Sequence, residues 1–368
     1  MVFGAGAVRE TGLLAKSLGA RHALIVTDKG VNRVGLTSPV QSALESSGIA
    51  CTVFDGVDPN PIEANVEAGL DVYRNAGCDI IVGLGGGSPL DGAKAIKLRA
   101  THDGPFEQYD DNIGGDALIR DDMPPLLAIP TTAGTGSEVG RSTVITCRVT
   151  DRKTVFFSPC LMPNFAICDP ELTVGMPPMI TAATGMDALT HNLEAYVAKP
   201  YHPMADGIAL AGIRLCNKSL RKAVEHGGDL EARADMMMAA AMGATAFQKG
   251  LGVTHSLAHP LSSIAGMHHG TANAVLLPYV IDFNEEACWR LLSDIADVIG
   301  VEKEPGTVAK WVRDLNAAIG IPDKLSAFGV TAEMIPAMVD KATQDGCHVN
   351  NPKACTAEDM RKLYEAAL

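Results

Sequence analysis

Several features of common protein classes are missing from this 368-residue chain. It has no uninterrupted apolar run near the roughly 20 residues of a membrane span, and its first residues, MVFGAGAVRE, lack the basic start and apolar stretch of a signal peptide. We therefore expect a cytoplasmic protein without a membrane partner. The net charge of -13 argues against a nucleic-acid partner, because nucleic acids are bound by clustered basic surface.

The cysteine pattern excludes two further classes. The nine cysteines are odd in number and never form a C-x-x-C pair, so they are interpreted as reduced, mostly buried small hydrophobes rather than as disulfides or a zinc knuckle. The chain also has no internal repeat and no low-complexity segment. Its length exceeds what one hydrophobic core usually supports, so two domains are expected. A content of 47% apolar and 20% charged residues is ordinary for a soluble globular enzyme.

The first half of the chain alternates apolar runs with amphipathic stretches. Strands are predicted at residues 22–27, 50–54, 78–86 and 126–132, with further short strands at STVITC and FAICD. Helices are predicted between them, in VQSALESSG, EANVEAGLDVYRNAG and DGAKAIKLRA. Strands that are apolar throughout are typical of a parallel sheet covered on both faces, which is the doubly wound α/β arrangement.

The composition changes after the segment DPELTVGMPP. From Thr181 onward, Ala, Met and Leu recur at helical spacing, and the run ADMMMAAAMG is interpreted as core filling rather than a copper site. We predict an α/β dinucleotide-binding domain over residues 1–178 and an all-helical metal-binding domain over 179–368, with the active site in the cleft between them. The single histidines are predicted to be surface or capping groups; they are His22, His102, His202, His226 and His348.

Acid and imidazole side chains form two helical pairs in the second half. Asp187 and His191 are four residues apart, as are His255 and His259, and His269 follows in MHHG. Residues four apart share one helix face, so each pair can direct two donor groups at one point. One carboxylate with two or three imidazoles suits iron(II), zinc, cobalt or manganese and leaves coordination positions for a substrate oxygen. The spacing therefore predicts a catalytic metal centre without dividing ligands from non-ligands.

Two glycine-rich loops follow apolar strands in the first half. GLGGGSPLDGAK (83–94) leads into a helix whose N-terminus can bind a phosphate. The loop does not match the G-x-G-x-x-G fingerprint. Ser88 can bind the phosphate or, alternatively, cap that helix. PTTAGTGSE (130–138) follows a second strand, and two such loops in one sheet would face a common crevice. Asp28, after the first strand, can bind both ribose hydroxyls and repel a 2'-phosphate, or can simply be a turn residue.

With these motifs assembled, the chain resembles the iron-containing alcohol dehydrogenase family. The matching text includes FGAGAV, VTDKG, PNP, GGGSPLDGAK, PTTAGTGSE, DPELT, AATGMDALTH, HSLAHPL, HHGTANAVLLP and NPKACTAEDMRKLYEAAL, so it covers nearly the whole chain. The resemblance implies that the metal, Fe2+ or alternatively Zn2+ or another divalent ion, is held by Asp187, His191, His255 and His269. It places His259 beside the nicotinamide without ligating the metal.

The resemblance also assigns positions to the cofactor, which it implies is NAD rather than NADP because of the acid at position 28. It places Asp28 on the adenosine ribose and Gly86, Gly87 and Ser88 on the pyrophosphate. Further positions lie along the nucleotide or on the cofactor side; they are Thr131, Thr132, Thr135, Asn60, Asp91, Lys94 and Lys153. A homodimer or larger homo-oligomer is also expected.

The predicted activity is reversible hydride transfer between a small alcohol and NAD. A divalent metal would acidify the alcohol, and His259 is the candidate proton relay, with a buried, ligand-orienting role as its alternative. The stretch AFQKGLG is similar to the corresponding sequence in the branch that includes 4-hydroxybutyrate dehydrogenase, so an ω-hydroxy acid is the favoured substrate. Lys249 in this stretch either contacts the substrate carboxylate or is solvated. The other hypotheses are a simple alcohol or diol dehydrogenase, a metal lyase of the dehydroquinate synthase type, and a non-catalytic sensor.

Overall fold

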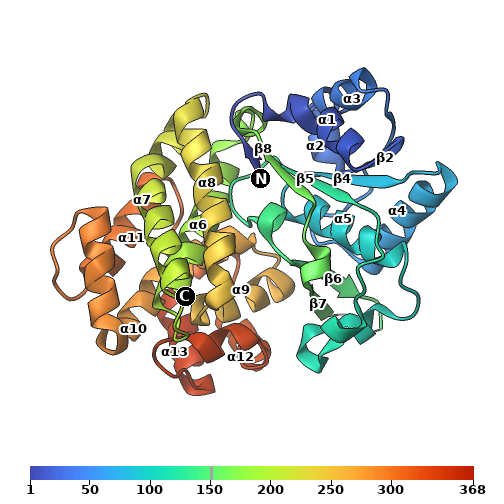
Figure 1. Ribbon diagram of the computed structural model, residues 1–368. Coiled ribbons are helices and arrows are strands. Elements are labelled where there is room, and N and C mark those ends of the chain that lie inside the picture. Colours follow the sequence, from blue (N-terminus) through green and yellow to red (C-terminus); the bar gives the residue numbers. More distant parts are fainter. Residues whose placement is uncertain (150–151) are drawn as a thin grey trace. The chain divides into compact units, whose positions relative to one another are not determined.

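The computed structural model describes residues 1–149 and 152–368. These residues form two compact units (Figure 1). The sheet unit comprises Met1–Thr132 and Gly136–Thr173, and the helical unit comprises Ala133–Thr135 and Val174–Leu368. Among the described residues, none of the helices combines the length and the apolar composition that a membrane span requires.

Six parallel strands form the main sheet of the sheet unit. In spatial order they are β1 (Val2–Phe3), β8 (Phe165–Cys168), β5 (Leu126–Pro130), β4 (Ile80–Gly85), β2 (His22–Val26) and β3 (Ala50–Phe54). The four principal strand predictions and the strand in FAICD are confirmed. STVITC also forms a strand, β6 (Ser142–Cys147), but it pairs antiparallel with β7 (Arg152–Phe157) outside the main sheet, and β7 was not predicted.

Helices cover both faces of this sheet. Alternate residues of β2 point to opposite sides: Ala23 and Ile25 pack with α1 (Thr11–Ser17) and α3 (Thr37–Ser46), while Leu24 and Val26 pack with α4 (Glu63–Asn75) and α5 (Gly87–Arg99). A short helix, α2 (Lys29–Arg33), follows β2. Because both faces are apolar and covered, the doubly wound prediction is confirmed.

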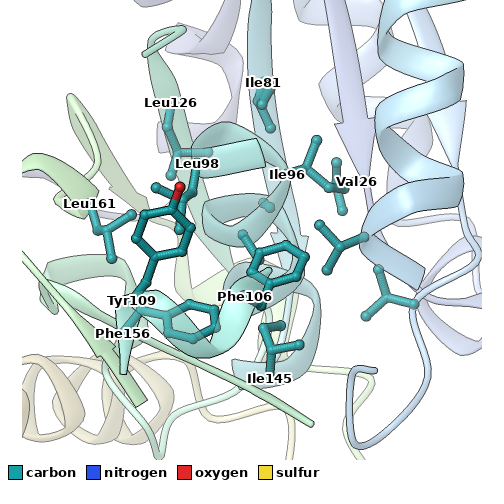
Figure 2. Close-up of a cluster of buried hydrophobic side chains, with 14 of the residues drawn as sticks. Val26, Ile81, Ile96, Leu98, Phe106, Tyr109, Leu126, Ile145, Phe156 and Leu161 are labelled. Atoms are coloured by element: carbon teal, nitrogen blue, oxygen red, sulfur yellow. The ribbon is translucent and has the colours of Figure 1, made fainter. Parts of the chain in front are cut away.

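The core on the α4 and α5 side extends to the hairpin of β6 and β7 (Figure 2). Phe156 of β7 stacks on Phe106 with ring centroids 5.5 Å apart, and Tyr109 meets Phe156 edge-on. These aromatic contacts attach the hairpin to the sheet unit. His102 also belongs to the interior here: it is 1% exposed, so its prediction as a surface group is wrong. Its Nδ1 atom donates to the Leu98 carbonyl in the last turn of α5, which agrees with the capping alternative, and its Nε2 atom accepts from the Arg120 backbone.

The helical unit is built around one buried helix. α6 (Pro178–Val197) is buried from Thr181 to Val197, on all of its sides, as expected for a helix surrounded by others. Its neighbours are α7 (Pro203–Glu225), α8 (Leu230–Ala246) and α10 (His269–Ile299). The remaining helices are α9 (Val253–Ile264), α11 (Thr307–Ala318), α12 (Ile335–Ala342) and α13 (Ala357–Ala367). The predicted helical second half is confirmed.

The cysteines and the methionine run behave as the composition indicates. All nine cysteines lie in the described residues and are free, and five of them are buried. Met236 and Met237 of α8 are at most 2% exposed, so the methionine run fills the core of the helical unit.

Candidate metal centre and nucleotide loops

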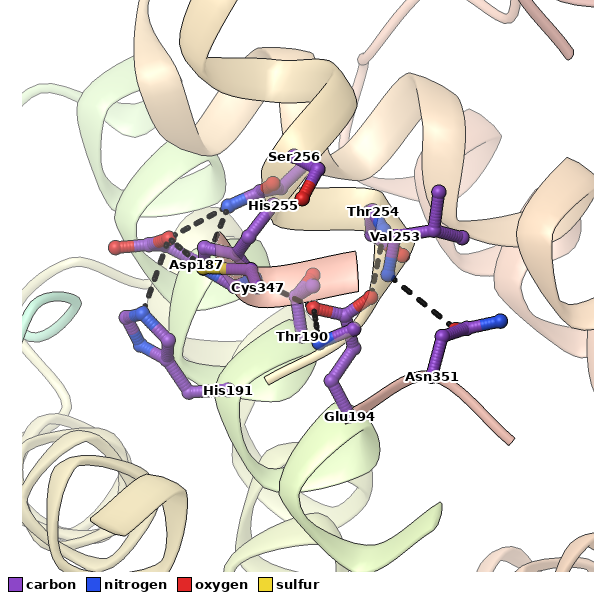
Figure 3. A network of polar contacts seen from close by, with 12 residues as sticks. Asp187, Thr190, His191, Glu194, Val253, Thr254, His255, Ser256, Cys347 and Asn351 are labelled. Atoms are coloured by element: carbon purple, nitrogen blue, oxygen red, sulfur yellow. Dashed lines mark hydrogen bonds and ion pairs between the residues drawn. The ribbon is translucent and has the colours of Figure 1, made fainter. Parts of the chain in front are cut away.

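Three helices of the helical unit bring one carboxylate and three imidazoles together. Figure 3 shows Asp187 with two of the imidazoles, those of His191 and His255. Asp187 and His191 lie one turn apart on α6, His255 is on α9, and His269 begins α10. The Asp187 Oδ1 atom lies 3.9 Å from His191 Nε2, 4.0 Å from His255 Nε2 and 3.5 Å from His269 Nε2. One imidazole from each helical pair and the following His269 therefore converge on one carboxylate oxygen.

These separations suit a shared metal ion. Metal–ligand bonds of about 2.1 Å at tetrahedral angles place ligand atoms about 3.4 Å apart. Ligand atoms of Asp187, His191 and His255 lie within 4.8 Å of one another, and His269 Nε2 is closer to Asp187 than either of the other imidazoles. Nitrogen and carboxylate donors of this kind suit iron(II) or zinc, and the donor set therefore fits the metal predicted from the sequence.

A glycine lets the third imidazole approach. A Cβ atom on Gly270 would lie 2.0 Å from the Ala183 carbonyl oxygen, so only glycine allows α10 to begin this close to α6. Gly270 directly follows His269, and a Cβ there would also lie 3.2 Å from the Asp187 Cβ. The close contact of the two helices therefore sets the distance between His269 and Asp187.

The electrostatics of the cluster favour a bound cation. Burial opposes ionisation of Asp187, but His191, His269 and His255 outweigh it and lower its pKa to about 2. Burial lowers the pKa of His191 to about 4, and it lowers the pKa of His269 well below its usual value, so both imidazoles keep a lone pair at neutral pH. An ionised buried carboxylate beside neutral imidazoles is the arrangement that a divalent ion would neutralise.

Glu194 orients His255 from behind. This residue is 2% exposed, and its Oε2 atom accepts a hydrogen bond from His255 Nδ1 at 2.6 Å (Figure 3). It also accepts from the backbone N–H groups of Gly252 and Thr254, at the N-terminus of α9. Burial opposes the charge on each partner, but their pairing raises the pKa of His255 and lowers that of Glu194. The contact fixes Nδ1 as the protonated nitrogen and leaves Nε2 to face Asp187.

Asn273 lies one helical turn beyond His269. Its Nδ2 group donates to Asp187 Oδ1 at 2.8 Å and lies 3.2 Å from His269 Nε2. Its buried Oδ1 atom has no hydrogen-bond partner among the described residues. Asn273 therefore holds the ligand carboxylate while one of its own polar atoms stays unsatisfied, which is a further indication that a charged group belongs at this centre.

His259 lies beside the cluster, with a more exposed side chain. Its ring stacks on His269 with centroids 5.2 Å apart, and 42% of its side chain is exposed, against 2% for His255. Its Nδ1 atom contacts Asp345 Oδ2 at 2.7 Å. His259 is thus adjacent to the ligands but open to solvent on another side.

The predicted nucleotide residues lie at the carboxyl ends of neighbouring strands in the sheet unit. Gly86, Gly87 and Ser88 follow β4, and Thr131 and Thr132 follow β5. The Thr131 N–H donates to the Gly85 carbonyl at 3.0 Å, and a Cβ on Gly86 would lie 3.3 Å from the Thr132 side chain. The prediction that the two loops lie together is therefore confirmed.

The turn after β4 requires glycine for a backbone reason as well. Gly85 has φ +147°, and a Cβ there would lie 2.6 Å from the Pro89 side chain. Helix α5 begins immediately afterwards with Gly86 as its N-cap, so its first N–H groups are available to a phosphate. The alternative in which Ser88 caps this helix is wrong, because Gly86 is the N-cap and the Ser88 hydroxyl donates to the Pro59 carbonyl.

Other predicted cofactor positions already have protein partners. The Asp28 carboxylate caps α2 by accepting from the Val31 N–H. Lys153 Nζ donates to Asn60 Oδ1 at 2.7 Å, so these two predicted positions contact each other. Thr135 belongs by its contacts to the helical unit, where a Cβ on the adjacent Gly134 would lie 2.9 Å from the Thr184 Cβ.

Asp91 and Lys94 lie inside the sheet unit and hold a loop. Lys94 is fully buried and donates to the carbonyls of Ser137, Gly140 and Ser142. Burial lowers its pKa to about 8. Asp91 accepts from the Ser137 hydroxyl and the Val144 N–H. Both residues therefore shape the segment that follows PTTAGTG.

The environment of Lys249 matches neither of the two predicted for it, which were solvent and a substrate carboxylate. It is 8% exposed, and its ammonium donates to the Tyr196 carbonyl and to Asp206 Oδ1 at 2.5 Å. The prediction of a solvated lysine is therefore wrong. The suggested contact with a substrate carboxylate has no support here, because the ammonium is already paired with a carboxylate of the chain.

Three residues of the centre were missed in the sequence. Glu194 follows His191 by three residues and Asn273 follows His269 by four, so both lie on the helix faces that carry ligands, and this spacing could have identified them. Asp345 is 86 residues from its partner His259 and has no spacing signal that links the two.

Comparisons with known proteins agree along the whole chain. The profile of "Iron-containing alcohol dehydrogenase" matches residues 1–170, and that of "Fe-containing alcohol dehydrogenase family, C-terminal" matches residues 181–368. The 4-hydroxybutyrate dehydrogenase of Cupriavidus necator is 43% identical over 361 residues, covering 95% of this chain and 93% of that protein.

Solved structures give the same result for the fold. A 1,3-propanediol oxidoreductase superposes with a TM-score of 0.95 at 39% identity, covering 100% of this chain and 97% of that one. Sulfoacetaldehyde reductase from Bifidobacterium kashiwanohense, solved in complex with NAD+, has a TM-score of 0.91 at 32% identity and covers 100% of this chain and 96% of that one.

Proposed function

Because the chain belongs to the iron-containing alcohol dehydrogenase family, we propose that it interconverts a small ω-hydroxy acid and the corresponding semialdehyde. The general activity is that of the family: a metal-dependent oxidoreductase that exchanges a hydride between an alcohol and NAD. The observation that carries the site is the convergence of three imidazole Nε2 atoms within 3.5 to 4.0 Å of one oxygen of Asp187.

In this proposal the four converging side chains hold the metal, and they are Asp187, His191, His255 and His269. When bound, a divalent metal supplies Lewis acidity to the alcohol oxygen, and NAD supplies the hydride acceptor. Glu194 keeps Nε2 of His255 directed at the centre. The glycine-rich turn Gly86–Ser88 binds the pyrophosphate, the adjacent Thr131 and Thr132 lie along the nucleotide, and Asp28 binds the ribose of NAD.

His259 is the proposed proton relay. Its ring contacts the ligand His269, while 42% of its side chain is exposed, so it can pass a proton between the reacting alcohol and solvent. His259→Ala should lower turnover and leave metal content near one per chain. His226→Ala, at an exposed end of α7, is the matched control and should change neither quantity. Loss of metal from His259→Ala would contradict the relay role.

The substrate proposal is supported by the relatives. One of them is named for 4-hydroxybutyrate and another for sulfoacetaldehyde, and both compounds carry an anionic group. A diol is the second candidate, because the chain is also similar to a 1,3-propanediol oxidoreductase. We do not assign the carboxylate contact to Lys249, because Asp206 already pairs with it.

One experiment tests these points together. Protein prepared anaerobically is analysed for metal and then assayed for NADH formation with 4-hydroxybutyrate, 1,3-propanediol and ethanol. We expect one divalent metal per chain and the highest kcat/KM with 4-hydroxybutyrate. Preference for the uncharged alcohols would contradict the ω-hydroxy acid. A lyase of the dehydroquinate synthase type would give no stoichiometric NADH, and a sensor would show no turnover after reconstitution with iron(II) or zinc.

We also propose a homo-oligomer in the cytoplasm. The mass in solution, measured by light scattering, and the distribution of the protein after cell fractionation test these two statements.

A further inference from the structure

Asp345 receives three hydrogen bonds at one point of the helical unit. It lies just before the short 3-10 helix η11 (Gly346–Asn350). Its Oδ2 atom accepts from His259 Nδ1 at 2.7 Å, and its Oδ1 atom accepts from the Ser256 hydroxyl at 2.8 Å and from the Cys347 N–H at 2.9 Å. The carboxylate therefore links the segment after α12 to two residues of α9.

The charge of Asp345 determines which nitrogen of His259 carries the hydrogen. Burial opposes ionisation, but His259, Cys347 and Ser256 outweigh it and hold the pKa of Asp345 far below its usual value. An ionised carboxylate can only accept hydrogen bonds, so Nδ1 of His259 must be the donor. The neutral ring then has its lone pair on Nε2. Stacking on His269, at an interplanar angle of 12°, fixes the plane of the ring.

We propose that Asp345 is a positioning residue, which holds His259 in one orientation and one tautomer with Nε2 available to take the proton of the substrate hydroxyl. This inference rests on the relay role proposed for His259. It parallels the contact between Glu194 and His255: in each pair a carboxylate accepts a hydrogen bond from Nδ1 of a histidine on α9, so that the Nε2 lone pair is free to act elsewhere.

A second metal site is the competing interpretation of the same atoms. Donor atoms of His259, Asp345 and Cys347 lie within 4.8 Å of one another. One observation disfavours it. The short contact between His259 Nδ1 and Asp345 Oδ2 already occupies two of the atoms that would have to bind the ion.

The first test measures the tautomer directly in the zinc-loaded enzyme labelled with 15N-histidine. We expect the His259 resonances, assigned by their loss in His259→Ala, to show a protonated Nδ1 and an unprotonated Nε2. The opposite tautomer, or a mixture of both, would overturn the proposal without any Asp345 variant being needed. Because this measurement does not depend on turnover, it stands even if no alcohol in the substrate panel is oxidised.

The second test is a double-mutant cycle in the metal-loaded enzyme. Asp345→Asn should lower kcat by about 10- to 100-fold, with metal content at one per chain and the KM for NAD unchanged. In the His259→Ala background the same substitution should have no further effect, because Asp345 acts through His259. Asp340→Asn, an exposed residue of α12, is the matched control and should leave kcat unchanged.

Three outcomes would overturn the proposal. Multiplicative losses in the double variant would show that Asp345 acts independently of His259. A second equivalent of metal in the wild type that disappears in Asp345→Asn would favour the metal site. A wild-type kcat in Asp345→Asn would show that the contact has no part in turnover. In contrast, a wild-type enzyme that forms no NADH would contradict the proposed function itself.

Discussion

Replacing Glu194 by Gln would separate the two tasks of this buried carboxylate. Glu194 accepts from His255 Nδ1 at 2.6 Å, Thr254 N at 2.7 Å and Gly252 N at 3.0 Å. A glutamine offers one acceptor oxygen in place of two, so at least one of these donors would face an N–H2 group. The substitution therefore removes the charge and leaves a buried donor without a partner.

The expected loss of stability follows from these contacts. A buried donor without an acceptor costs about 1–3 kcal/mol, and removing a negative charge from the N-terminus of α9 costs about 0.3–1 kcal/mol more. We therefore expect the free energy of unfolding to fall by about 1–4 kcal/mol. For a unit of this size each kcal/mol corresponds to about 2–4 °C, so Tm should fall by about 3–16 °C in a thermal scan of the metal-loaded protein.

Metal affinity provides the second measurement. Because the Nδ1 contact sets the orientation and basicity of His255, its loss should weaken binding by about 10- to 100-fold in a zinc titration against a competing chelator. Glu231→Gln is the control: its side chain is 77% exposed on α8, and both quantities should stay within error. A lower Tm with unchanged metal affinity would refute the orienting role and leave Glu194 as a helix cap only.

Three further predictions concern the two units separately. Lys94→Met should lower the Tm of the sheet unit and weaken NAD binding at least about tenfold by calorimetry, because three carbonyls of one loop would lose their common donor. Burial raises the pKa of Glu138 from 4.5 to about 7, so the free energy of unfolding falls as pH rises through that interval. Glu138→Gln removes this loss and should therefore raise Tm at pH 8 more than at pH 5. Chelation should lower the Tm of the helical unit, and zinc at about 100 times its Kd should restore about 2.7 kcal/mol of stability, whereas an unchanged Tm would contradict the metal centre.

Local patterns predicted the elements that carry the site. The apolar strands were located from sequence because their residues are buried on both faces, and in β4 every residue is buried, which makes the run continuous in the text. The pair Asp187 and His191 was equally readable, because one helical turn fixes their geometry before any tertiary contact forms. Strand β7 was missed because it begins with the charged residues Arg152 and Lys153, and its core face depends on the distant Phe106.

The roles of the two histidines on α9 depend on the tertiary structure. His255 and His259 are one turn apart on the same helix, so spacing treats them alike. The structure distinguishes them through their carboxylate partners, which come from opposite sides in sequence: Glu194 lies 61 residues before His255, and Asp345 lies 86 residues after His259. The first pair is 2% exposed beside Asp187, whereas His259 is 42% exposed beside His269. A buried imidazole with its Nε2 toward a carboxylate is suited to hold an ion, and a half-exposed one with the same tautomer is suited to move a proton. The role of each histidine on α9 therefore depends on its carboxylate partner and on how far the rest of the chain covers its ring.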